Sequence, residues 1–190
     1  MSAKDLIISL PHPHLRAPSR RVTAINPEVK KLIDEMIAAA LDWEDHRQHE
    51  IGVALAAIQI DQPYRIIVIR NNFDDKKDRS FSVFINPEIT KREGPIEDDY
   101  EGCLSVPDIY GLVPRQAKVR VRALNELGQP MRVKAEGFLA RVLQHEIDHL
   151  KGVMFVDHIK DQPQAFYKLT KDGKLAKLNY DKIAKADLFR

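Results

Sequence analysis

The sequence predicts a single α+β domain, with short mixed or antiparallel strands packed around a central helix. Two amphipathic helical patterns, separated by several short runs of strand character, indicate this class. The chain has 190 residues, of which 44% are hydrophobic, and this is enough for one complete core. We expect the domain to span residues 1–166 and a basic C-terminal extension to span residues 167–190.

The first long element is predicted to be a helix that begins after Asn26. Asn is a favourable N-cap residue, and Pro27 suits the first helical turn. Apolar residues then recur at three- and four-residue spacing as far as about Asp45. This stripe comprises Val29, Leu32, Ile33, Met36, Ile37 and Ala40.

Strands are predicted in the middle of the chain. Residues 64–70 form an apolar run typical of a buried strand, and residues 81–85 form a second one after a charged turn. Residues 119–123 and 131–135 alternate between apolar and basic or polar side chains. The turn residues 125–129 between them indicate a hairpin.

The second helix is predicted around the sequence His145-Glu146-Ile147-Asp148-His149, and Gly152 can end it. On a helix, His145 and His149 project from one face and can bind one ion. Glu146 lies about 60° around the helix from His149, where a carboxylate can act as a general base without binding the metal. An amphipathic helix with solvent-exposed histidines is the alternative interpretation.

A catalytic ion usually has three protein ligands, so a third donor is needed. The chain contains one cysteine, Cys103, within the sequence Glu-Gly-Cys-Leu-Ser at residues 101–105. A lone cysteine cannot form an internal disulfide, which fits a reduced, cytosolic setting. A small buried hydrophobic residue is the alternative role for Cys103, but its polar, Gly-containing context favours a ligand.

Residues 101–105 and 144–152 resemble the second and third motifs of the peptide deformylase family. That family's other motif is Gly-x-Gly-x-Ala-Ala-x-Gln, and residues 52–59 read Gly-Val-Ala-Leu-Ala-Ala-Ile-Gln. The three motifs occur in the family's order, and the similarity covers about residues 10–160. The resemblance implies a hydrolase that removes the formyl group from the N-terminal methionine of newly made proteins.

The resemblance also implies the roles of individual residues. Three side chains would hold one divalent metal: Cys103, His145 and His149. Iron(II) is the expected cellular metal, with zinc, nickel or cobalt as alternatives, and the thiolate and imidazole donors suit both zinc and iron(II). Glu146 would be the general base, while the Gln59 amide and the backbone N–H of Leu104 would stabilise the oxyanion. A surface or strand-end amide is the alternative for Gln59.

Small residues in the first two motifs would line the substrate: Gly52, Val53, Ala54 and Gly102. Ala54 departs from the family pattern, which has Gly there. If this position needs a positive φ, Ala costs about 1 kcal/mol of strain; with a negative φ, its methyl group only narrows the cleft. Tyr110 would cap the substrate by stacking or hydrogen bonding, and an exposed loop aromatic is the alternative.

Polar residues outside the motifs give weaker indications. Arg115 follows the Cys motif and can fold back to Asp148, which would steady the metal helix, although an ordinary surface Asp is the alternative. The other histidines have no motif around them and are interpreted as surface or packing residues. They are His12, His14, His46, His49 and His158.

The predicted partners are N-formylmethionyl nascent peptides, with no membrane. No apolar run reaches transmembrane length, and residues 6–10 are too short for a signal-peptide core, so a cytoplasmic bacterial protein is expected. Residues 167–190 hold seven Lys or Arg and three Asp. A transient contact with ribosomal RNA through this extension is one hypothesis, and a solvated basic tail is the other.

Two other functions fit parts of the pattern. An endopeptidase with the same two-histidine motif is one, but the upstream Cys ligand and the small-residue cleft favour a formyl group as substrate. A metal-stabilised module that binds formyl peptides without turnover is the other. Such a module would need neither Glu146 nor Gln59, so these two residues favour an enzyme.

Overall fold

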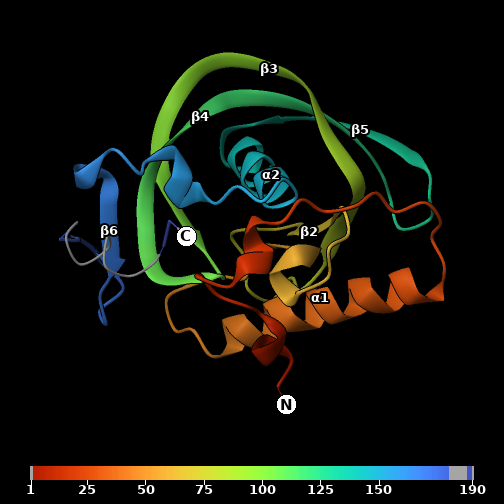
Figure 1. Ribbon diagram of the computed structural model, residues 1–190, viewed down its shortest axis with the longest axis horizontal. Coiled ribbons are helices and arrows are strands. Elements are labelled where there is room, and N and C mark those ends of the chain that lie inside the picture. Colours follow the sequence, from red (N-terminus) through yellow and green to blue (C-terminus); the bar gives the residue numbers. More distant parts are fainter. Residues whose placement is uncertain (1, 180–187, 190) are drawn as a thin grey trace.

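The computed structural model describes residues 2–179, 188 and 189. Within these residues one antiparallel sheet of seven strands accompanies two α-helices, α1 (Pro27–Asp45) and α2 (Gly137–His149), which confirms the predicted α+β class (Figure 1). The strand order is β1-β2-β3-β4-β6-β7, and β5 also pairs with β4. The strands are β1 (Ala54–Ala56), β2 (Ile66–Arg70), β3 (Phe81–Cys103), β4 (Val106–Leu124), β5 (Pro130–Glu136), β6 (Phe166–Leu169) and β7 (Leu175–Lys177). Short 3₁₀ helices are η1 (Ala3–Leu6), η2 (Pro13–Arg16), η3 (Ala57–Ile60), η4 (Phe155–His158) and η5 (Pro163–Ala165).

Helix α1 begins and ends where the sequence predicts. The Asn26 side chain accepts a hydrogen bond from the backbone N–H of Val29 at 3.0 Å, and Pro27 occupies the first turn. The predicted stripe faces inward and packs with apolar residues of β1, β2 and the start of β3. Helix α1 therefore covers one face of this part of the sheet.

Strands β3 and β4 form a long curved hairpin that arches over α2 (Figure 1). The prediction of a strand that stops at residue 85 was wrong, because β3 continues to Cys103. Asn86 adopts a left-handed φ of 53°, and four register shifts allow pairing with β4 to go on beyond it. Most side chains between residues 88 and 100 are exposed or half-buried, so this stretch has no apolar alternation that sequence inspection could detect.

The predicted hairpin at residues 119–135 is confirmed, since β4 pairs with β5 from Lys118↔Glu136 to Leu124↔Pro130. At the other end of β4, residues 109–111 pair with β6, which pairs in turn with β7. The predicted boundary after residue 166 thus falls inside β6, and residues 167–169 and 175–177 belong to the sheet. Residues 180–187 and 190 of the predicted extension lie outside the described residues.

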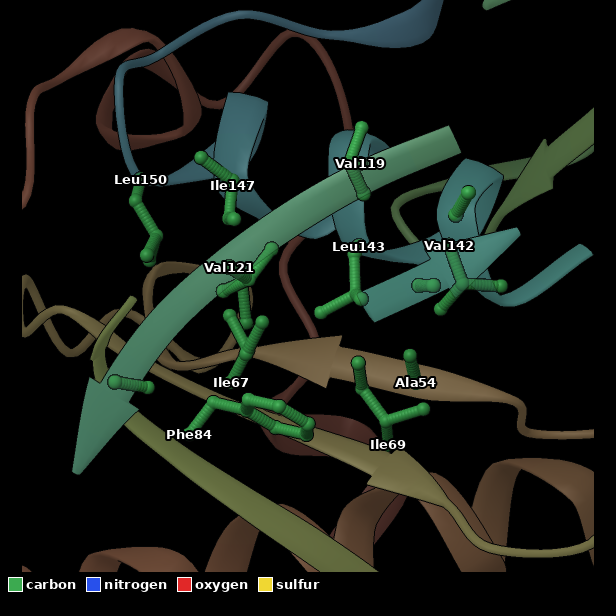
Figure 2. Packing of buried hydrophobic residues seen from close by; sticks show 14 of the residues in the cluster. Ala54, Ile67, Ile69, Phe84, Val119, Val121, Val142, Leu143, Ile147 and Leu150 are labelled. Carbon is green, nitrogen blue, oxygen red and sulfur yellow. The ribbon is translucent and has the colours of Figure 1, made fainter. Parts of the chain in front are cut away.

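The central core lies between α2 and the sheet (Figure 2). Leu143 and Ile147 point from α2 towards Val119 and Val121 of β4 and towards β1 and β2. These α2 side chains are almost completely buried, which fixes the rotation of the helix about its own axis. Because this rotation is fixed, the side of α2 that carries the two histidines faces the candidate site.

Neither α1, α2 nor any other described helix has the length and apolar character needed to cross a bilayer.

Candidate active site

The three predicted metal ligands lie together. Cys103 is the last residue of β3, and His145 and His149 lie one turn apart on α2. The Cys103 Sγ is 3.3 Å from the His149 Nε2, which is 3.1 Å from the His145 Nε2. Three donor atoms that converge at these distances, one sulfur and two imidazole nitrogens, suit a zinc or iron(II) ion. The alternative of solvent-exposed histidines is excluded, because both are buried.

The electrostatics of the two histidines fit a pair of ligands. Burial and the nearby His145 lower the pKa of His149 well below its usual value. Burial also disfavours charge on His145, but hydrogen bonds with Cys103 and Glu101 outweigh it and raise the pKa of His145. Two imidazoles whose nitrogens face each other at 3.1 Å cannot both be protonated there. A divalent ion between these atoms would take the place of the proton.

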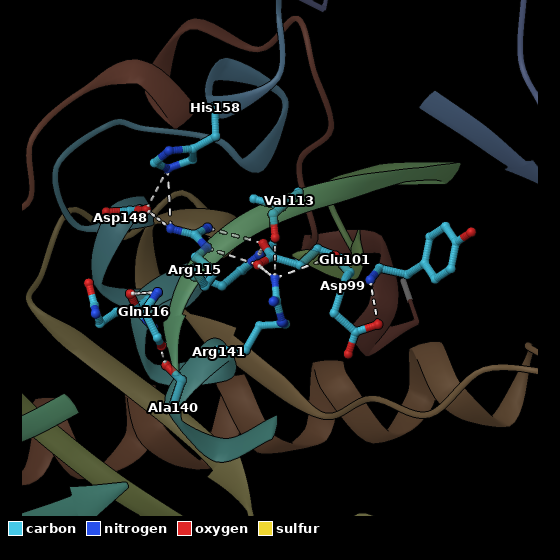
Figure 3. A network of polar contacts seen from close by, with 12 residues as sticks. Asp99, Glu101, Val113, Arg115, Gln116, Ala140, Arg141, Asp148 and His158 are labelled. Carbon is cyan, nitrogen blue, oxygen red and sulfur yellow. Dashed lines mark hydrogen bonds and ion pairs between the residues drawn. The ribbon is translucent and has the colours of Figure 1, made fainter. Parts of the chain in front are cut away.

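His145 contacts a buried network that includes Glu101. Figure 3 shows Glu101 in this network with Arg115 and Arg141. The Glu101 carboxylate contacts the His145 Nδ1 at 2.9 Å and accepts hydrogen bonds from Arg115 at 2.8 and 3.0 Å and from Arg141 at 2.9 Å. Burial opposes ionisation of Glu101, but these contacts lower its pKa below the usual range. Sequence inspection did not identify Glu101 or Arg141 as part of the site, although Glu101 lies two residues before the Cys ligand.

The predicted contact between Arg115 and Asp148 is confirmed. The Arg115 Nη1 donates to the Asp148 carboxylate, and the His158 Nε2 lies 2.8 Å from the same oxygen atom (Figure 3). Burial opposes ionisation of Asp148, but the contacts with His158 and Arg115 lower its pKa to about 2. Arg115 therefore connects two acidic residues, Glu101 on β3 and Asp148 on α2.

Glu146 lies beside the three ligand residues. Only 4% of the residue is exposed, and its Oε2 is buried without a hydrogen-bond partner among the described residues. Burial raises the pKa of Glu146 to about 7. A carboxyl group with this pKa and a free oxygen atom can both accept and return a proton near neutral pH.

Gln59 is held in one orientation on η3. Its Oε1 accepts a hydrogen bond from the Ala56 backbone N–H at 2.8 Å, and its Nε2 lies 3.1 Å from the Ser105 Oγ and 3.4 Å from the Cys103 Sγ. Gln59 is 1% exposed, so the interpretation as a surface amide is excluded. Leu104 lies in the two-residue turn between β3 and β4. Both residues adjoin Cys103, and their role at an oxyanion stays a prediction.

A cavity of about 340 Å³ opens beside these residues. It is lined by Glu146, Gln59 and the ligands Cys103 and His145, and by several residues predicted to contact substrate: Val53, Ala54, Gly102, Leu104 and Tyr110. Gly52 is not in the lining. A Cβ atom at Gly52 would lie 2.5 Å from the Ala40 carbonyl oxygen, so close packing against α1 explains the glycine. A role for Gly52 at the substrate stays a prediction.

Ala54 and Tyr110 have defined places in this cavity. Ala54 is in β1, paired with Ile69, and its φ is not positive, so the strained alternative is excluded and its methyl group narrows the cavity. Tyr110 is in β4 and its hydroxyl donates to Glu50 at 2.8 Å, which excludes an exposed loop aromatic. Burial, together with Glu50, raises the pKa of Tyr110. A Cβ atom at Gly102 would lie 2.7 Å from the Tyr110 ring.

Comparison with known proteins identifies the family. Residues 4–165 match the polypeptide deformylase family. The chain belongs to the peptide deformylase family. A peptide deformylase of Mesorhizobium japonicum is 43% identical over 183 residues, which cover 94% of this chain and 99% of the relative. Another from Agrobacterium fabrum is 43% identical over 159 residues, which cover 84% of this chain and 88% of the relative.

Solved deformylase structures agree with this assignment. The crystal structure of a peptide deformylase from Legionella pneumophila has a TM-score of 0.71 and 34% identity, with 97% of each chain covered. A peptide deformylase of Plasmodium falciparum has a TM-score of 0.74 and 28% identity, covering 96% of this chain and 92% of that one. The chain is therefore a metal-dependent hydrolase that removes the N-formyl group from nascent peptides, with a Cys-His-His metal site.

Proposed function

We propose that this deformylase works through a divalent ion held by Cys103, His145 and His149, with Glu146 as its general acid and base. The observation that carries the proposal is the convergence of these ligand atoms beside the free Oε2 of Glu146. We further propose iron(II) as the cellular metal, because one thiolate and two imidazoles suit it; zinc, nickel and cobalt(II) also fit these donors. When bound, the ion supplies Lewis acidity to the reacting groups.

The residues around the metal would act on the formyl group in sequence. Glu146, with a pKa raised to about 7, takes a proton from the attacking water and then delivers it to the departing amine. Charge that develops on the formyl oxygen meets the Gln59 Nε2 and the Leu104 backbone N–H. Because the Gln59 amide is already fixed by Ala56 and Ser105, little reorganisation accompanies this step.

The cavity supports a preference for N-terminal formylmethionine. The apolar side chains of Val53, Ala54 and Leu104 line it together with the ligands Cys103 and His145. Such a site accepts an unbranched apolar side chain more readily than a charged or branched one. Gly102, which lines the cavity, would allow the peptide backbone to approach closely.

A formate-release assay tests the assignment, with protein purified without oxygen and analysed for metal. We expect formate release from a formyl-Met peptide and no internal cleavage of a longer, unformylated peptide. Internal cleavage without formate release would support an endopeptidase instead. Formyl-peptide binding without any release of formate would support the binding module.

The free Cys103 thiol also supports a cytoplasmic location, because reducing conditions keep it available as a ligand.

The basic extension, residues 167–190, would make a transient contact with ribosomal RNA. Exposed Lys171 and Lys174 lie between β6 and β7, at the edge of the sheet. The Lys171→Glu, Lys174→Glu double variant should lose co-sedimentation with ribosomes at low salt. This variant is preferable to a deletion, because Leu188 is 5% exposed and contributes to the core. Unchanged co-sedimentation would leave a solvated basic extension as the explanation.

A further inference from the structure

A second group of metal-ligating side chains lies on the outer surface of the enzyme. Among the described residues, two groups of three or more such side chains bring their ligand atoms within 4.8 Å of one another. One is the Cys103 centre, and the other comprises His12, His14 and Asp61. We propose that this second group is an accessory site for a divalent cation of the zinc type.

The two histidines face Asp61 from the start of η2. The His12 Nδ1 accepts the backbone N–H of His14 at 3.4 Å, and the two rings meet edge to face with their centroids 5.0 Å apart. The His14 Nδ1 forms an ion pair with the Asp61 carboxylate. Each residue thus offers one donor atom to a shared volume at the protein surface.

The backbone holds these three side chains on rigid elements. Leu15, next to His14, is completely buried, and the Ala17 backbone N–H donates to the His14 carbonyl at 3.0 Å. Asp61 follows η3 and has a left-handed φ of 59°, with its N–H 3.0 Å from the Ile58 carbonyl. Ligands on fixed elements lose little conformational freedom when an ion binds.

The donor set determines the kind of ion. Two imidazoles and one carboxylate form a common ligand set for zinc, which leaves a fourth position for water. Calcium and magnesium prefer oxygen ligands, and Asp61 is the only one of the three side chains that offers an oxygen atom. The side chains of His14 and Asp61 are 58% and 47% exposed. Solvent therefore screens their ion pair, and a bound cation can replace this contact at small cost.

Another histidine provides a matched control. His46 is the C-cap residue of α1 and lies beside Asp42, with 3.4 Å between its Nδ1 and a carboxylate oxygen. The His46 side chain is 54% exposed, close to that of His14. No third ligand joins this pair among the described residues. The accessory site therefore differs from an ordinary surface His–Asp pair by the presence of His12.

Zinc titration of the full-length enzyme tests the proposal, after the Cys103 centre has been loaded with one equivalent of metal. Calorimetry and metal analysis after desalting should show about one further zinc ion per chain. His14→Gln and Asp61→Asn should each lose this second ion, and Asn is suitable at position 61 because it tolerates the left-handed conformation. His46→Gln should retain it.

Two outcomes would overturn the accessory site. One is a wild-type enzyme that takes up no zinc beyond the first equivalent. The other is uptake that is unchanged in both His14→Gln and Asp61→Asn, which would place the second ion elsewhere. Because the two variants alter different elements of the fold, a folding defect in one leaves the other as a valid test.

Discussion

The Nδ1 of His145 lies 2.9 Å from the Oε2 of Glu101. An ionised carboxylate only accepts hydrogen bonds, so this contact assigns the proton of His145 to Nδ1 and leaves Nε2 free to bind a metal. Arg115 and Arg141 keep the Glu101 carboxylate ionised and fixed. Glu101 therefore controls which nitrogen of His145 faces Cys103.

Replacing Glu101 with Gln should weaken metal binding by about 10- to 100-fold, because the orientation and basicity of His145 depend on the carboxylate. Competition with a chelator would measure the affinity, and circular dichroism would verify that the variant is folded. Glu93→Gln is a suitable control, since Glu93 lies on β3 but pairs with Arg120 at the surface. Equal metal affinity in the Glu101 variant and the wild type would contradict this role.

Glu146→Ala should keep its metal and lose nearly all formate release, by about a hundredfold or more. The reason is that Glu146 lies beside the ligands while its Oε2 remains free to exchange protons. Metal analysis and the formate assay on the same sample would separate the two effects. Cys103→Ala should instead weaken metal binding, because it removes one of the three ligands. Unchanged turnover in Glu146→Ala would refute the mechanism.

Ala54→Gly should leave formate release within a few-fold of the parent, because the methyl group narrows the cavity without straining the backbone. The substitution should also destabilise the protein by about 0.5–1 kcal/mol, since Gly has more conformational freedom to lose in a strand. Steady-state kinetics and urea unfolding would measure the two effects. A hundredfold rise in turnover would mean that the methyl group obstructs the substrate.

Gly102→Ala should raise KM for a formyl-Met peptide, because the added methyl group would collide with the Tyr110 ring and disturb its bond to Glu50. Removing the ring in the Gly102→Ala, Tyr110→Ala double variant should relieve the collision. The Gly102→Ala, Tyr110→Phe variant keeps the ring and should not relieve it. If both double variants behave alike, contact with this ring is not the cause.

Glu44→Gln should destabilise the fold strongly, by about 3–5 kcal/mol, because it leaves the fully buried Arg70 without its counter-ion. Glu44 also accepts the Gly52 backbone N–H at 2.9 Å and so connects α1 to the first motif. Urea unfolding would measure the loss. Asp45→Asn removes the neighbouring exposed pair with Arg79 and should change stability little. Similar losses in the two variants would argue against burial as the cause.

Local patterns in the sequence predicted both α-helices and the pair of histidines on α2. The start of α1 depends on Asn26 and Pro27, and both are adjacent to the helix that they initiate. The positions of His145 and His149 follow from helical spacing alone. Family resemblance supplied Cys103 as the third ligand, and the structure brings its Sγ to 3.3 Å from His149.

Several features that depend on distant contacts were not predictable in this way, although the contact between Arg115 and Asp148 was. The exposed part of β3 has no apolar alternation, so only pairing with β4 reveals it as a strand. Arg141 lies on α2 and contacts Glu101 on β3, 40 residues earlier in the chain. The packing of Gly52 against the Ala40 carbonyl is likewise invisible without the path of α1. In each case the deciding contact joins two elements whose relative position the sequence does not state.

The placement of Cys103 at the tip of the β3–β4 hairpin has a consequence during protein synthesis. A ribosome adds about 5–20 residues per second, so the thiol is made roughly 2–8 seconds before His145. Throughout that interval the growing chain contains only one of the three donors that converge at the candidate metal site. Metal loading at this site must therefore follow the synthesis of α2, which supplies both histidines.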